Sequence, residues 1–102
     1  MLKHCVFIDF RDEVQELEQH KVFKELASLQ DEIKGLVKFE FGNNLDFEQK
    51  AIDFNSGFIA SFDSYDSLIE YNNNSNHVAL GKKLVSMTNG GYKGIIVFDI
   101  ET

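Results

Sequence analysis

The order in which the hydrophobic period changes along the chain constrains the fold most strongly. Alternation of apolar and polar residues predicts four strands, at residues 2–10, 36–41, 54–62 and 94–100. Apolar residues spaced three and four apart predict a helix between the first two strands, with its core positions at Val14, Leu17, Val22, Leu26, Leu29 and Ile33. Two shorter helical segments, after Asp63 or Ser64 and over about 75–87, separate the last two strands. The predicted order is β-α-β-β-α-β.

This order predicts an α+β, ferredoxin-like domain with an antiparallel sheet and all helices on one face. The glycine at position 35 is expected to end the first helix, and Gly42 to end the second strand. Residues 43–53 are polar and charged and are expected to form a loop. The chain has 102 residues, no proline and no linker-like stretch, so residues 1–102 are expected to form a single domain.

The face of the sheet opposite the helices also carries apolar residues. On the first strand this face holds Cys5 and Phe7. On the second strand the period allows either Val37, Phe39 and Phe41 or their polar neighbours. A sheet with helices on one face only must bury the other apolar face against something else. We therefore expect a homodimer that is formed through the sheet face.

His4 is an unusual residue for the face of the first strand on which it lies. It shares that face with Leu2, Val6, Ile8 and Phe10. A titratable ring among apolar side chains must be neutral and hydrogen-bonded, or must line a cavity. The position of His4 is compatible with a satisfied core histidine, which is the more frequent case, and with one wall of a pocket.

Charge and cysteine content exclude several classes of protein. The net charge of −7 argues against nucleic acid and against an anionic membrane surface as partners. Cys5 is the only cysteine, which fits a reducing compartment and a cytoplasmic location. We expect no signal peptide, because the N-terminus lacks a charged region followed by an apolar run. We expect no membrane span, because no apolar stretch is long enough to cross a bilayer.

Several segments together resemble one known family, the stress-responsive dimeric α/β-barrel domains. The resemblance covers about residues 1–101 and rests on His4 with the following Val6 to Phe10, Gly42-Asn43-Asn44, Phe54 to Phe62, the run from Phe62 to Tyr71, His77, and Val97-Phe98-Asp99. It implies two ferredoxin-like protomers that pack sheet against sheet. Where the family often has His-Pro-X-His, this chain reads Asn74-Ser75-Asn76-His77.

The resemblance also implies roles for three residues. The family includes a plant cyclase that closes polyketide rings without a cofactor, and by this resemblance His77 is the general base. Tyr71 would orient the substrate or stabilise an oxyanion, and His4 would support it through a hydrogen bond. A further pocket histidine of that cyclase corresponds to Ser56 here. Tyr71 and His77 are also compatible with a packing ring and a solvated surface residue.

Two functions therefore remain open at the level of sequence. The first is a stress-associated or small-ligand-binding dimeric protein, whose ligand would be a small hydrophobic or carbonyl-bearing compound. The alternative is a cofactor-free, polyketide cyclase-like enzyme that uses histidine and tyrosine for acid-base chemistry. No metal or cofactor is expected in either case, because the sequence has no ligand set at a recognisable spacing and no phosphate-binding glycine motif.

Overall fold

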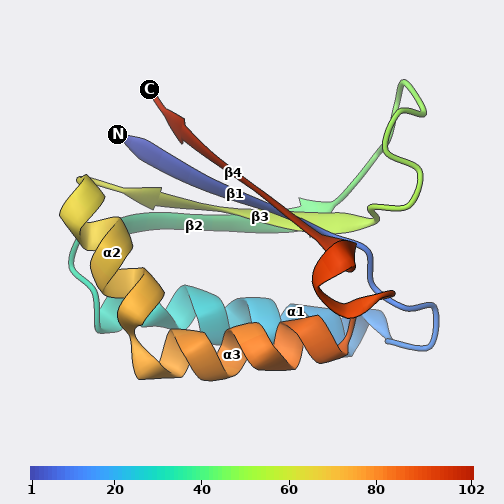
Figure 1. The fold of residues 1–102 in the computed structure, drawn as a ribbon, viewed down its shortest axis with the longest axis horizontal. Coiled ribbons are helices and arrows are strands. Elements are labelled where there is room, and N and C mark those ends of the chain that lie inside the picture. The colour runs from blue at the N-terminus through green and yellow to red at the C-terminus, as the bar shows by residue number, and fades with distance from the viewer.

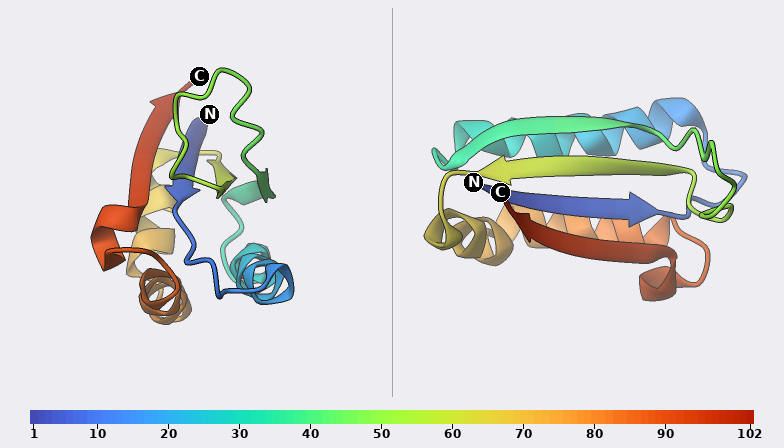
Figure 2. Two further views of the ribbon diagram at one scale, coloured as in Figure 1. Left: turned by 90° about the vertical axis from the view of Figure 1, so that its right-hand side faces the viewer. Right: turned by 90° about the horizontal axis from the view of Figure 1, so that it is seen from above.

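The computed structural model describes all residues from Met1 to Thr102. Its four-stranded antiparallel sheet has the order β2-β3-β1-β4 and is built from β1 (Leu2–Ile8), β2 (Leu36–Asn43), β3 (Ser56–Phe62) and β4 (Ile95–Glu101). One face of the sheet is covered by α1 (Glu16–Ala27), α2 (Tyr65–Asn73) and α3 (Ser75–Ser86) (Figure 1). Views from two further directions show the helices as one layer beneath the sheet (Figure 2). The predicted ferredoxin-like β-α-β-β-α-β order is confirmed.

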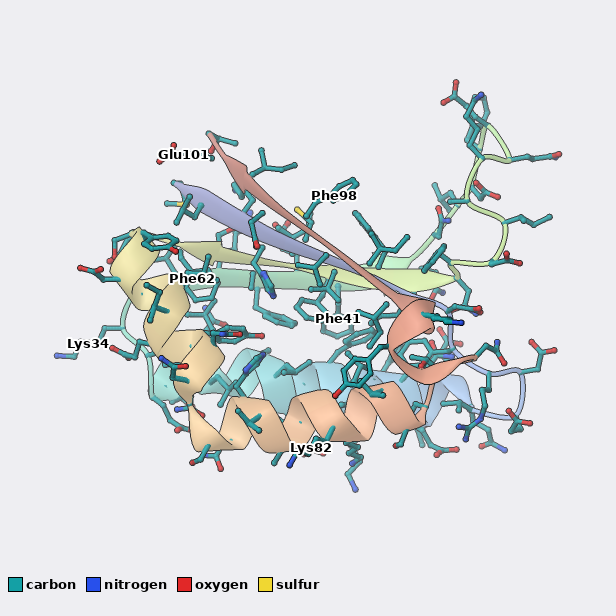
Figure 3. All side chains as sticks on the ribbon, viewed as in Figure 1. Lys34, Phe41, Phe62, Lys82, Phe98 and Glu101 are labelled. Carbon is teal, nitrogen blue, oxygen red and sulfur yellow. The ribbon has the colours of Figure 1, made fainter.

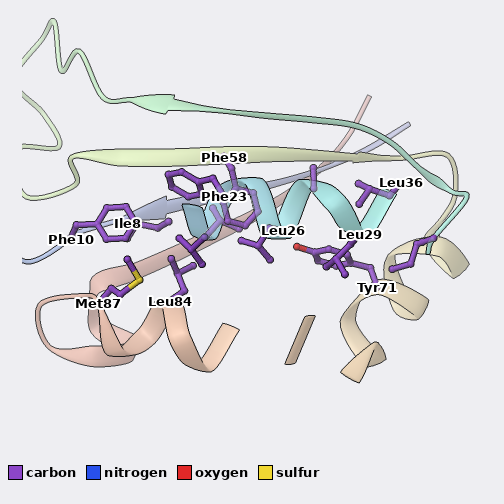
Figure 4. Close-up of a cluster of buried hydrophobic side chains, with 14 of the residues drawn as sticks. Ile8, Phe10, Phe23, Leu26, Leu29, Leu36, Phe58, Tyr71, Leu84 and Met87 are labelled. Carbon is purple, nitrogen blue, oxygen red and sulfur yellow. The ribbon is translucent and has the colours of Figure 1, made fainter. Parts of the chain in front are cut away.

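The core lies between the sheet and the helices. The register pairs Val6 with Phe58 and Ile8 with Ser56, so the residues that alternate on β1 and β3 point toward the helices together. These side chains join residues of the helices in one cluster of 16 buried residues, part of which is shown in Figure 4. Its largest fully buried side chains are Tyr71, Phe10, Phe23, Phe62, Ile8, Leu26, Leu29 and Ile33.

The first helix is shorter than its apolar spacing predicts. Helix α1 begins at Glu16, after Gln15, whose backbone N–H donates to the Glu18 carboxylate (3.4 Å). Val14 is buried although it precedes the helix. Leu17 was expected in the core, but it is 81% exposed. It lies nine residues before Leu26, which places it on the opposite side of the helix.

The end of this helical region also differs from the prediction. Helix α1 ends at Ala27 and continues as a short 3₁₀ helix, Ser28–Asp31. Gly35 does not have the positive φ of a glycine that ends a helix. Its lack of a side chain serves packing instead, because a Cβ at this position would overlap the side chain of Ser67. Ser64, rather than Asp63, caps α2 by accepting a hydrogen bond from the backbone N–H of Ser67 (3.2 Å).

The strand ends shift by one or two residues from the predicted positions. Strand β2 does not end before Gly42, because Gly42 pairs with Gly57 and Asn43 pairs with Ser56. Strand β3 begins at Ser56 rather than Phe54. Gly94, which was expected to begin β4, is the last residue of a 3₁₀ helix, Gly91–Gly94. None of the helices has the length and apolar character needed to cross a lipid bilayer.

The second face of the sheet, called the open face below, has no helix over it. Pairing in the sheet places on this face Lys3, Cys5, Phe7, Lys38, Glu40, Gly57, Ile59, Ser61, Ile96, Phe98 and Ile100. Phe98 points away from the helices (Figure 3) and is 59% exposed. Of the two alternatives for β2, the structure has the one that places polar residues on the open face, here Lys38 and Glu40. Phe39 and Phe41 face the helices, because the register shifts between Leu36 and Lys38.

Candidate functional site

Three elements bring His4, Tyr71 and His77 together on the helix side of the sheet. His4 comes from β1, Tyr71 from α2, and His77 from the first turn of α3. The ring centroids of Tyr71 and His77 are 4.1 Å apart, and those of His4 and Tyr71 are 5.8 Å apart in an edge-on arrangement. All three residues named from the sequence thus lie in one group, with Tyr71 in contact with both histidines.

His4 is held in place by a carboxylate from the neighbouring strand. Its Nδ1 lies 2.6 Å from Oδ1 of Asp99, the residue that pairs with His4 across β1 and β4. Because a carboxylate can only accept, Nδ1 of a neutral His4 ring carries the proton and Nε2 is left as an acceptor. The His4 side chain is only 15% exposed, whereas the Asp99 side chain is 50% exposed. Asp99 is a member of the site that the sequence reading did not name.

Tyr71 is the most deeply buried member of the group. Its relative exposure is 1%, and its ring packs edge-on against Phe62 at 5.0 Å between centroids. Figure 4 shows the ring at one end of the buried cluster. The hydroxyl oxygen is buried without a hydrogen-bond partner. Burial raises the pKa of Tyr71, so the phenol stays protonated and can donate a hydrogen bond.

His77 is oriented by the cap of its own helix. The side chain of Asn74 accepts hydrogen bonds from the backbone N–H groups of Asn76 (2.9 Å) and His77 (3.0 Å). The Nδ1 atom of His77 is buried without a hydrogen-bond partner. Burial lowers the pKa of His77, and the nearby His4 acts in the same direction, against an opposing effect of the Asn72 backbone. The ring is therefore a neutral base near pH 7.

The arrangement supplies a proton donor and a proton acceptor side by side. Tyr71 offers an O–H group, and neutral His77 offers its Nδ1 atom, which is buried without a hydrogen-bond partner. Both lie in a largely apolar environment, where hydrogen bonds to a bound molecule are stronger than in water. His4 and Asp99 form a second, charge-assisted pair beside them. We name these four residues the His-Tyr cluster.

The other two positions that the family resemblance singled out do not add to the cluster. The hydroxyl of Ser56 donates to the backbone carbonyl of Gly42 (3.0 Å). Ser56 is four residues along β3 from Ala60, the partner of His4, which is about 13 Å along a strand. Asn74 acts on the cluster only through the cap that orients His77.

The signal that could have identified Asp99 is its place in the last strand. Asp99 alternates with Ile95 and Val97, so it shares with them the face that points toward the helices. A carboxylate at such a position requires a partner, as a titratable ring does at His4. A groove of about 710 Å³ on the other side of the sheet was also missed, and its lining does not include the His-Tyr cluster. No group of three or more His, Cys, Asp and Glu side chains could hold a metal ion.

Comparison with solved structures finds proteins of the same fold. A dimeric ferredoxin-like protein of unknown function from Jannaschia sp. CCS1 is 32% identical, with a TM-score of 0.92 over 99% of this chain and 98% of that one. A crystal structure from Arabidopsis thaliana (20% identity, TM-score 0.87, 100% and 95% of the chains) and the hydroxynitrile lyase from Passiflora edulis (14%, 0.81, 97% and 90%) share the fold.

A comparison with curated proteins finds no match. The family model described as "Stress responsive A/B Barrel Domain" matches residues 2–102, which is nearly the whole chain. The chain therefore belongs to the stress responsive A/B barrel (Dabb) domain family.

Proposed function

We propose that this Dabb protein is a homodimer that binds a small, mainly apolar molecule with a carbonyl or another polar oxygen at the His-Tyr cluster. One observation carries the binding site: the buried Tyr71 hydroxyl and the buried His77 Nδ1 have no hydrogen-bond partner, yet their rings are in contact. Buried polar atoms without partners are uncommon in folded proteins and call for an explanation. A ligand oxygen that accepts from Tyr71 and a ligand hydroxyl that donates to His77 would satisfy both.

The homodimer is supported by the open face. Phe7, Ile96, Phe98 and Ile100 are 38% to 59% exposed in the single chain, on a face that no helix covers. A second sheet that packs on this face would remove them from water. The Jannaschia protein, which is 32% identical, is described as dimeric. Cys5 is free and buried, so it fits a reducing compartment such as the cytoplasm without taking part in a disulfide.

The binding proposal can be tested with acetophenone, an aromatic ketone, as the probe. We expect the ring resonances of Tyr71 and His77 to shift in NMR spectra as acetophenone is added. The Tyr71→Phe variant removes the donor to the carbonyl and should weaken binding by about tenfold, the effect of one lost neutral hydrogen bond. Tyr92, which is 79% exposed, provides the control variant Tyr92→Phe. Shifts of equal size in the wild type and in Tyr71→Phe would contradict this site.

A second function, cofactor-free acid-base catalysis, is favoured by one specific feature. A neutral His77 next to a protonated Tyr71 is the pair of groups needed to move a proton from the carbon beside a carbonyl. His77 would take the proton, and the Tyr71 hydroxyl would donate a hydrogen bond to the enolate oxygen that forms. Return of the proton to carbon restores both partners, so no oxidant or cofactor is consumed.

Deuterium exchange distinguishes catalysis from binding alone. In D₂O the methyl protons of acetophenone should be replaced by deuterium faster with the protein than in buffer, as followed by proton NMR. His77→Phe should abolish this acceleration, whereas Tyr92→Phe should leave it unchanged. Binding of the ketone without any accelerated exchange would leave the ligand-binding function and exclude proton abstraction from this ketone.

A further inference from the structure

The loop between β2 and β3 holds large apolar side chains in water. Leu45, Phe47 and Ile52 are 91%, 95% and 82% exposed. They belong to residues 44–55, which overlap the polar and charged loop predicted at 43–53. Three nearly bare apolar side chains lie on one short loop, and apolar groups gathered at one place on a surface mark contact sites.

The 44–55 loop is held in shape by its own polar side chains. Asp46 Oδ1 accepts from the backbone N–H groups of Lys50 (3.0 Å) and Ala51 (3.0 Å). The amide of Asn44 donates to the carbonyl of Phe54 (2.7 Å), and its oxygen accepts from the N–H of Asp46 (2.8 Å). The apolar side chains are therefore presented on an ordered scaffold, which lowers the entropy lost when they are bound.

The loop rises from the sheet on the side away from the helices (Figure 1). It forms one wall of the groove of about 710 Å³, to which it contributes Leu45, Lys50, Ala51 and Phe54. The floor is part of the open face and includes Phe7, Ile59, Ile96 and Phe98. Leu45 thus connects the exposed loop to the apolar floor of the groove, whereas Phe47 and Ile52 lie outside its lining.

We propose that the 44–55 loop is a clasp that grips a second copy of this chain, and that the groove beside it receives side chains of that copy. The inference rests on the proposed homodimer and extends it from the sheet to the loop. Packed sheets lie about 10 Å apart. The loop rises on the side of the open face at the end of β2 and β3, so it is placed to contact a sheet packed there. Under two-fold symmetry each copy both gives and receives this contact.

The polar lining of the groove favours protein side chains over a small polar ligand. Glu40 is paired with Lys38 (3.5 Å), Asn44 is used within the loop, and Ser56 donates to Gly42. These three have no free group aimed at a ligand, and Asn43 is the one remaining uncharged polar side chain of the lining. Lys50 is the one cationic side chain in the lining, and it suits a partner with a net charge of −7.

The test is the dissociation constant of the dimer, measured by sedimentation velocity at nanomolar to micromolar concentrations. The triple variant Leu45→Ser, Phe47→Ser, Ile52→Ser should raise this constant at least about 100-fold, because three large side chains lose their burial. Leu17→Ser with Tyr65→Ser is the matched control, since these residues are 81% and 67% exposed on α1 and α2, away from the loop. The control should leave the constant within about threefold of the wild type.

Two further arms separate this inference from the homodimer itself. The variant Ile100→Ser removes a side chain that is 48% exposed on the open face and lies outside the groove, and it should also weaken the dimer. A weakened dimer in Ile100→Ser with an unchanged constant in the triple variant would overturn the clasp and keep the homodimer. An unchanged constant in both would overturn the dimer through the open face. Phe47→Ser, at a site that is 95% exposed, gives the same test in a variant whose fold is not at risk.

A fluorescent probe tests whether the groove binds a small molecule instead of a second copy of the chain. Anilinonaphthalene sulfonate is an apolar anion that becomes bright in apolar grooves. The clasp predicts little fluorescence from the wild-type dimer and a rise in Ile100→Ser, because the monomers expose a groove whose lining is unchanged. Bright fluorescence from the wild-type dimer that disappears in the triple variant would show a small-molecule groove instead.

Discussion

Removing the hydroxyl of Tyr71 should make the free protein more stable and impair its ligand site. The ring of Tyr71 is packed against Phe62 and His77, and phenylalanine would keep these contacts. Only the hydroxyl is lost, and that group is buried without a partner. An unpaired buried polar group costs about 1–3 kcal/mol on folding, so Tyr71→Phe should raise the free energy of unfolding by at least about 1 kcal/mol.

The assay is urea denaturation at a single protein concentration, because the stability of a dimer depends on concentration. A gain of about 1 kcal/mol corresponds to a rise of roughly 4–8 °C in the Tm of a domain near this size. Tyr92→Phe, at a site that is 79% exposed, is the control and should change stability by less than about 0.5 kcal/mol. An increase in stability together with weaker acetophenone binding would identify Tyr71 as a residue kept for function.

A loss of stability in Tyr71→Phe would refute this reasoning. Removing a hydroxyl that makes a good hydrogen bond destabilises a protein by about 0.5–1.5 kcal/mol. Such a loss would mean that the hydroxyl is satisfied in the folded protein and that it needs no ligand. The sign of the change therefore decides between the two interpretations, whatever its size.

Three further changes test the fold and the cluster. Burial lowers the pKa of His77 from its ordinary 6.5, so the unfolded chain binds the proton more readily than the folded one. The free energy of unfolding should therefore be at its full value above about pH 7.5 and should fall as the pH drops through 6.5. Urea midpoints measured across this range should fall less steeply in His77→Phe. Gly35→Ala should cost about 1–3 kcal/mol through overlap with a neighbouring serine, whereas Gly42→Ala, with open space around its Cβ, should be close to neutral in the same urea assay. Asp99→Asn should cost less than about 1 kcal/mol, since the carboxylate is half exposed, but it should free the tautomer of His4, which nitrogen-detected NMR reports.

The sequence was enough to predict the architecture because each segment has a clear period. The alternation around Val6 and Phe58 and the helical spacing of Val22 and Leu26 both lead to the core that is observed. The ends of the helices and strands were less well predicted, because they depend on capping and packing interactions that hydrophobic periodicity does not reveal. Gly35 is the clearest case: it was expected to allow a helix end, and it serves close packing against Ser67.

For the candidate site, the sequence and the family resemblance identified the three rings but not their partner. His4, Tyr71 and His77 come from segments far apart in sequence, and only the pairing of β1 with β4 places Asp99 beside His4. The loop predicted at 43–53 is present, but its mixed composition did not reveal that Leu45, Phe47 and Ile52 are exposed. The hydrogen bonds of Asp46 shape the loop and so determine which of its side chains point outward. Hydrophobic periodicity in the sequence does not predict these hydrogen bonds.

Strand β4 connects the proposed interface to the His-Tyr cluster. It is an edge strand that pairs only with β1, and most of its side chains are exposed in the single chain. Asp99 points from this strand to His4, while its neighbours Phe98 and Ile100 point to the open face. A partner that buries Phe98 and Ile100 restrains the backbone on both sides of Asp99 and so holds its carboxylate against His4. In such a dimer, the geometry of the cluster and the stability of the interface depend on the same strand. A substitution at Phe98 or Ile100 would then alter the position of the Asp99 carboxylate beside His4.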